Sequence, residues 1–399
     1  MALAPARSAA PTAARRKSAG KPFLGLIDAI IVDAPAEYSF DGSVTTEHAN
    51  AAWMWMTRDL APDLIDVEAV GDIPNSAAAL DAIVPELLTR ARQALSQVQT
   101  DSEAIRRIKS QLGGEEAWAK LPVVLNALRC RSLLEKAQGF GRAANGMGDE
   151  ATLALALQSM PLQDQAVASL LMHAAVSQVA MPSRLVTAAI RITSSAAEGA
   201  LVRAGFAPLI NAILAHAQNQ ILPLNQVGTF GDMDLICRSV DRFHRLLRAV
   251  TGYVELERGS RWSAISSALT KSVSERLDPK LRDVAPDLNL ALRRREGTDR
   301  VDGDQILSAL NGMYLLATVR DSRDSLAVNA LFDQVWAQTG QALEIHIERN
   351  LEQLRRNPGD TVTSARVDAA LKMAEIRFNQ EYAETMRKAK EATERTSRA

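Results

Sequence analysis

Between Leu235 and Leu277 the apolar residues recur in alternating steps of four and three, which places them on one side of an α-helix. In the first half of this stretch the apolar side carries Ile236, Val240, Phe243, Leu247, Val250 and Val254. The opposite side is mostly basic and carries Arg238, Asp241, Arg242, Arg245 and Arg248. Because glycine weakens a helix, Gly252 and Gly259 leave two interpretations open: one long interrupted helix, or two helices.

The same spacing predicts helices along most of the chain. Thr45 or Thr46 is expected to cap the first of them, and Asp302 is expected to cap the one that begins at Asp304. Helical patterns cover Thr46–Leu60, Ser76–Leu95, Ser102–Leu112, Glu115–Gln138, Asp304–Leu316, Ser325–Leu354 and a last helix from Thr363 to Met386. The sequence therefore predicts an all-α protein, a multi-helix bundle or irregular helical array. The apolar run near residues 24–32 fits either a buried helix or one short strand.

Charge nearly disappears between Ala151 and Gly231, where the only charged residues are Asp164, Arg184, Arg191, Glu198 and Arg203. This pattern predicts short helices covered on both faces. His173, Asn211 and His216 argue against a membrane span, since each polar side chain in hydrocarbon would need a partner. No membrane insertion is expected.

Five regions follow from these changes in composition. Residues 1–21 are predicted to be a disordered basic tail, 22–148 an N-terminal helical region, 149–231 a charge-poor middle layer, 232–388 a C-terminal region of long helices, and 389–399 a frayed charged tail. The glycine-rich segment Gly139–Gly148 is interpreted as a hinge between helical layers. A phosphate-binding loop is disfavoured because a helix, rather than a strand, precedes these glycines.

The overall composition restricts the possible partners and compartment. Apolar residues make up 47% of the chain and aromatic residues 4%, and the formal net charge is −1. A nearly neutral chain makes nucleic acid an unlikely obligatory partner. The isolated cysteines Cys130 and Cys237 suggest a reducing compartment, so a cytoplasmic location is expected, and the Ala- and Arg-rich composition is typical of a GC-rich bacterium.

No motif in the sequence predicts a metal site, a cofactor or a reaction. The acids Asp299, Asp302 and Asp304 do not fit a calcium loop, since Ala309 stands where the closing glutamate belongs. In Glu344-Ile-His-Ile-Glu348 the histidine lies on the opposite side of a helix from both glutamates, so the three cannot share one metal ion and the segment is interpreted as a solvated face. The sequence assigns no catalytic residue.

The favoured hypothesis is a non-catalytic helical protein that acts in protein–protein interaction, as a scaffold or regulator, or through self-association. One alternative is a helical enzyme with a pocket in the charge-poor region, using His173 or His216. Another is a nucleic-acid-associated regulator with an arginine-rich helix face; Arg293–Arg295 form a second basic cluster. The side chains expected to face a partner are Arg238, Arg242, Arg245, Arg248 and Trp55.

Overall fold

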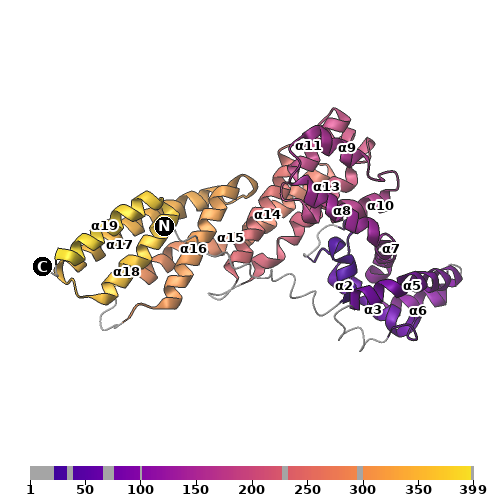
Figure 1. Ribbon diagram of the computed structural model, residues 1–399, viewed down its shortest axis with the longest axis horizontal. Helices are drawn as coiled ribbons and strands as arrows, with labels where there is room; N and C mark the ends of the chain where they lie inside the picture. The colour runs from indigo at the N-terminus through magenta and orange to yellow at the C-terminus, as the bar shows by residue number, and fades with distance from the viewer. Residues whose placement is uncertain are drawn as a thin grey trace. The chain divides into compact units, whose positions relative to one another are not determined.

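A computed structural model describes residues 22–33, 39–65, 76–98, 101–226, 232–293 and 300–396. In these ranges every regular element is a helix, and β-pairing is limited to isolated bridges from Ile31 to Val44 and from Ala197 to Glu255 (Figure 1). The predicted all-α class is therefore confirmed. The predicted basic tail, residues 1–21, lies outside the described ranges.

The chain divides into two compact units. The N-terminal unit comprises residues 1–219 together with 253–255, and the C-terminal unit comprises residues 220–252 together with 256–399. Each unit has its own helices and its own buried side chains, and each is described by itself below.

The N-terminal unit begins with α2 (Pro22–Ile27) and the 3₁₀ turn η1 (Asp28–Ile30). The apolar run near residues 24–32 is thus helical, and a strand is not formed. Only the single bridge between Ile31 and Val44 follows, fixed by hydrogen bonds from Val32 N to Val44 O and from Val44 N to Ile30 O at 2.9 and 3.0 Å.

The following helices of this unit are α3 (Thr46–Trp55), the π-helical turn η2 (Met56–Leu60), α5 (Ser76–Val98), α6 (Ser102–Gln111) and α7 (Glu115–Arg129). Thr45 caps α3, as predicted, by accepting the backbone N–H of His48 at 3.1 Å. Cys130 separates α7 from α8 (Arg131–Ala144), so the single helix expected over Glu115–Gln138 is instead two helices.

The glycine-rich segment Gly139–Gly148 is helical in its first part, because α8 continues through Gly139 and Gly141 to Ala144, and only residues 145–149 separate α8 from the next helix. The role of this segment as a hinge stays a prediction. Gly141 lies where α8 packs against α10 (Gln165–Gln178). A methyl group at Gly141 would come within 3.0 Å of the Ala175 carbonyl oxygen, so the glycine permits close approach of two helices rather than bending.

The charge-poor residues form α9 (Glu150–Gln158), α10, α11 (Ser183–Thr193), α12 (Glu198–Arg203) and α13 (Ala207–Asn219). Side chains are buried without interruption from Ala168 to Val176 in α10 and from Pro208 to Gln218 in α13. These two helices are covered on all faces, as the missing charges predicted. No helix in the described ranges is both long and apolar enough to span a bilayer.

The C-terminal unit contains α14 (Met233–Thr251) and α15 (Arg261–Leu292), which resolves the Leu235–Leu277 stretch into two helices. The predicted apolar stripes are buried: Ile236, Val240, Phe243, Leu247 and Val250 in α14, and Trp262, Ile265, Leu269, Val273 and Leu277 in α15. Helix α15 continues past Leu277 through Pro279 and Pro286, whose rings lie on its exposed side.

The remaining elements are the 3₁₀ turns η3 (Leu222–Asn225) and η4 (Arg323–Ser325) and the helices α16 (Gly303–Ser322), α17 (Asn329–Arg356), α18 (Thr361–Arg377) and α19 (Gln380–Thr396). Helices α17, α18 and α19 pack side by side, and α15 packs against α16 and α17 (Figure 1). Asp302 caps α16, as predicted. The last helix was expected to be continuous from Thr363, but it is broken at Phe378, and α19 extends through the predicted tail to Thr396.

Candidate functional site

A cleft of about 650 Å³ lies between α15 and α17 in the C-terminal unit. We call it the α15–α17 cleft. Its walls are formed by Ala285, Pro286, Asn289 and Arg293 of α15 and its C-terminal end, and by Gln338, Gln341, Ala342, Ile345, His346 and Arg349 of α17.

Helical periodicity brings these side chains together. On α17 the lining residues are spaced by three or four positions from Gln338 to Arg349, so they share one face of the helix. On the other wall, Asn289 and Arg293 stand one and two turns after Ala285. The cleft thus extends along three turns of α17.

His346 connects the two walls of the cleft. Its Nε2 atom lies 3.0 Å from Oδ1 of Asn289, the geometry of a ring N–H that donates to an amide oxygen. Burial lowers the pKa of His346, and the positive charges of Arg349 and Arg366 lower it further. The ring is therefore predominantly neutral at pH 7. The neighbouring Glu344 and Glu348 are exposed, as expected for a solvated face, whereas His346 is half-buried.

The formally charged side chains that line the cleft are both positive. Arg293 and Arg349 are exposed at its rim, and its lining contains no acidic residue. Among the described residues neither guanidinium has a carboxylate within ion-pair distance. An anionic group that entered the cleft would meet two arginine side chains that no acid among the described residues neutralises.

A second cavity, of about 520 Å³, adjoins the first at Arg293. Arg300 and the buried Arg366 line it, together with Asp302 and Asp304 at the start of α16. Asp302 accepts the backbone N–H groups of Asp304 and Gln305, at 3.1 and 3.3 Å, so it is engaged as a helix cap. Because arginines and aspartates both line it, this second cavity has a mixed charge.

The arginines predicted to face a partner on α14 are mostly neutralised within the helix. Arg238 pairs with Asp234 and Arg245 pairs with Asp241, each one turn earlier. Arg242 is half-buried, and burial lowers its pKa to about 10. Arg248 is exposed. The α14 face therefore offers less free positive charge than the α15–α17 cleft.

The prediction that Trp55 faces a partner is wrong. Only 2% of Trp55 is exposed, because this side of α3 packs into the core of the N-terminal unit. The more accessible tryptophan of the pair is Trp53, whose ring stacks on Phe23 with centroids 4.8 Å apart.

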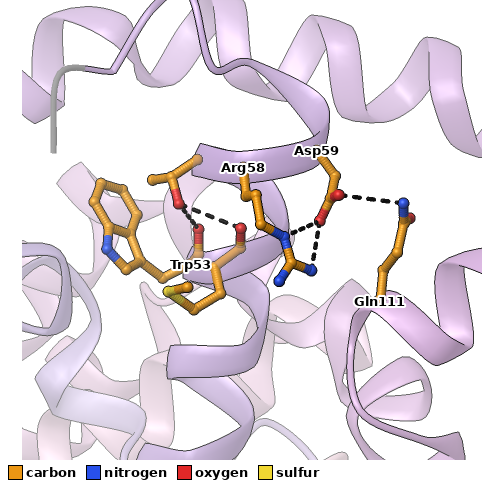
Figure 2. A network of polar contacts seen from close by, with 6 residues as sticks. Trp53, Arg58, Asp59 and Gln111 are labelled. Atoms are coloured by element: carbon orange, nitrogen blue, oxygen red, sulfur yellow. Dashed lines mark hydrogen bonds and ion pairs between the residues drawn. The ribbon is translucent and has the colours of Figure 1, made fainter.

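The π-helical turn η2 carries a polar network that holds it in place (Figure 2). Thr57 Oγ1 donates to the carbonyl oxygens of Trp53 and Met54, at 2.9 and 3.2 Å. The Asp59 carboxylate accepts from Arg58 and from Gln111, the last residue of α6. Since these groups bind one another, the network joins η2 to α6.

The structure brings His173 and His216 together, with ring centroids 5.5 Å apart. His173 Nε2 lies 3.0 Å from the Asp41 carbonyl oxygen, and His216 Nε2 lies 3.1 Å from the carbonyl oxygen of His173. Both rings are buried between α10 and α13, and neither is among the residues that line the cavities described for this unit. The Nε2 atom of each ring thus contacts a backbone carbonyl oxygen.

Within the described residues no group of three or more His, Cys, Asp or Glu side chains is placed to hold a metal ion. Comparisons with protein-family models, curated proteins and solved structures find no match to this chain.

The sequence analysis singled out Arg293 of the cleft lining but missed Asn289, Gln338, Gln341 and Arg349. The polar spacing from Gln338 to Arg349 was the available signal for the α17 wall.

Proposed function

We propose that this protein is a non-catalytic helical interaction protein whose C-terminal unit binds an acidic segment of a partner protein in the α15–α17 cleft. The observation that supports this function is the combination of Arg293, Arg349 and half-buried His346 in a cleft whose lining contains no acid. Carboxylates would form charge-assisted hydrogen bonds with both guanidinium groups.

A peptide matches the remaining lining better than a nucleic acid does. The carboxamides of Gln338 and Gln341 each contain a donor and an acceptor, which suits the N–H and C=O groups of a peptide backbone. Ile345 and Pro286 provide apolar contacts for a peptide side chain. The lining contains no Phe, Tyr or Trp ring on which a base could stack.

We also propose that the protein acts in a reducing compartment such as the cytoplasm. Cys130 and Cys237 are both free thiols, and Cys130 is buried. The Ala- and Arg-rich composition suggested a bacterial protein, and the compartment would then be a bacterial cytoplasm.

Fluorescence anisotropy with three labelled probes tests the function. The first is a short peptide of alternating glutamate and leucine, the second replaces every glutamate with glutamine, and the third is a single-stranded oligonucleotide of equal charge. The proposal expects the acidic peptide to bind at least about tenfold more tightly than the glutamine peptide, a difference of about 1.4 kcal/mol. Equal binding of the two peptides, or preferential binding of the oligonucleotide, would contradict it.

A further inference from the structure

A separate cleft of about 490 Å³ lies in the N-terminal unit between α7, the start of α10 and the loop that contains Asp41. Its polar lining includes Lys120 and Asn126 of α7, Gln165 and Ser169 of α10, and Asp41. We propose that this cleft binds a small neutral aldehyde or ketone and that Lys120 forms a Schiff base with it.

The loop beside Lys120 is held firmly against α10. His173 binds the Asp41 carbonyl oxygen, and Ser43 Oγ donates to the Phe40 carbonyl oxygen at 3.2 Å. Gly42 has a φ of +74°, and a methyl group there would come within 3.0 Å of Ser169. The floor of the cleft is therefore built from fixed backbone.

Lys120 is placed by this loop, and no carboxylate among the described residues forms an ion pair with it. Its Nζ atom donates to the Phe40 carbonyl oxygen at 3.1 Å, so the amine is anchored while it borders the cleft. Burial lowers the pKa of Lys120, and the attraction of Asp41 only partly opposes this effect. A larger fraction of the amine is consequently neutral, which is the nucleophilic form.

Two other shielded lysines show why Lys120 is distinctive. Lys390 is 8% exposed, but it pairs with Asp368 at 2.6 Å and with Glu394 at 3.7 Å, which keeps its charge compensated. Burial also lowers the pKa of Lys280, which donates to the Gln226 carbonyl oxygen, but Lys280 is not among the lining residues of any cavity described here. Of these three lysines, Lys120 is the one whose pKa is lowered and whose side chain also lines a cleft.

The proposed step needs no oxidant or reductant. The Lys120 nitrogen forms a bond to the carbonyl carbon, the carbonyl oxygen leaves as water, and both hydrogens of the neutral amine end in that water. Asp41 lines the same cleft, and its carboxylate would carry protons between the nitrogen and the departing oxygen. The amides of Asn126 and Gln165 would bind hydroxyl groups of the ligand.

The test uses the full-length protein with glycolaldehyde and cyanoborohydride near pH 7, followed by mass mapping of each lysine. Reduction of the imine fixes the probe on the nitrogen that formed it. The proposal expects Lys120 to be labelled at least about tenfold faster than exposed Lys136 and also faster than Lys280. If Lys120 reacts no faster than Lys136, or if Lys280 reacts as fast as Lys120, the proposal is overturned.

Asn126→Leu provides a second measurement on a protein that retains Lys120 and its contact with Phe40. The leucine removes a polar group from the cleft wall and occupies part of its volume, so labelling of Lys120 should slow several-fold while Lys136 is unaffected. Unchanged labelling of Lys120 in this variant would show that the cleft has no part in the reaction. Circular dichroism of both proteins confirms that they are equally folded.

Discussion

His346 and Asn289 join α17 to α15 by one hydrogen bond, with 3.0 Å between Nε2 and Oδ1, in the middle of the α15–α17 cleft. Burial and two nearby arginines lower the pKa of His346, so the ring adds no full charge to the cleft at pH 7. An acidic ligand would stabilise the imidazolium and raise this pKa. Binding therefore takes up a proton at mildly acidic pH.

We expect the affinity for the acidic peptide to increase as the pH falls from 7 toward 5, because the imidazolium adds a positive charge beside the ligand. In His346→Gln the amide cannot be protonated, and this increase should be lost while binding at pH 7 changes little. Anisotropy titrations at several pH values measure both proteins. An identical pH dependence in the variant would exclude His346 as its source.

The packing of α8 on α10 gives a stability test with a control in the same helix. Gly141→Ala places a methyl group against the Ala175 carbonyl oxygen, which belongs to backbone and cannot move aside easily. We expect a loss of roughly 2–3 kcal/mol in the free energy of unfolding, typical of overpacking in a core. Urea denaturation measures it.

Gly139→Ala is the matched control, because a methyl group at Gly139 meets no atom within 4 Å. Alanine is the better helix former, so this variant should gain about 0.5–1 kcal/mol. Equal destabilisation by the two substitutions would show that the flexibility of glycine, and not the close approach of α10, is what the α8 segment requires.

Burial of His173 predicts sensitivity of the N-terminal unit to acid. Desolvation lowers the pKa of His173 to about 4, below the value of 6.5 for an exposed histidine. Between these values the unfolded chain binds more protons than the folded one, so stability is lost as the pH falls from about 6.5 to about 4. The full loss from this residue is about 3 kcal/mol.

His173→Gln removes the titrating group, so the free energy of unfolding of the variant should fall less steeply between pH 6.5 and pH 4 than that of the wild type. Denaturant titrations at a series of pH values give this comparison independently of any stability change at pH 7. Parallel curves for the two proteins would mean that His173 is not protonated on unfolding in this range.

Periodicity predicted most helices and their buried faces, because the spacing of Ile236, Val240 and Phe243 is a local property of the chain. It failed at breaks without glycine or proline, such as Cys130 and Phe378. After Phe378, Asn379 Oδ1 accepts the backbone N–H of Tyr382 at 2.7 Å and caps the next helix. The helix end predicted before Gly139 was placed too early, because a glycine required for close packing has the same sequence signature as one required for bending.

The cleft could not be predicted from the sequence in the same way. Asn289 and His346 are 57 positions apart, and only the pairing of α15 with α17 brings them together. The Arg238–Arg248 face looked more basic in sequence, but Asp234 and Asp241 lie one turn before Arg238 and Arg245 and pair with them. Free charge depends on such neighbours and on burial, which the sequence specifies only indirectly.

The most direct test of the proposed function compares two charge reversals on α17, Arg349→Glu inside the cleft and Arg355→Glu on the exposed surface beyond it. Each changes the net charge equally, so a general electrostatic effect would alter both alike. We predict that Arg349→Glu weakens binding of the acidic peptide at least about tenfold, or about 1.4 kcal/mol, and that Arg355→Glu changes it less than about threefold. Equal weakening by both, or no weakening by Arg349→Glu, would contradict binding in the α15–α17 cleft.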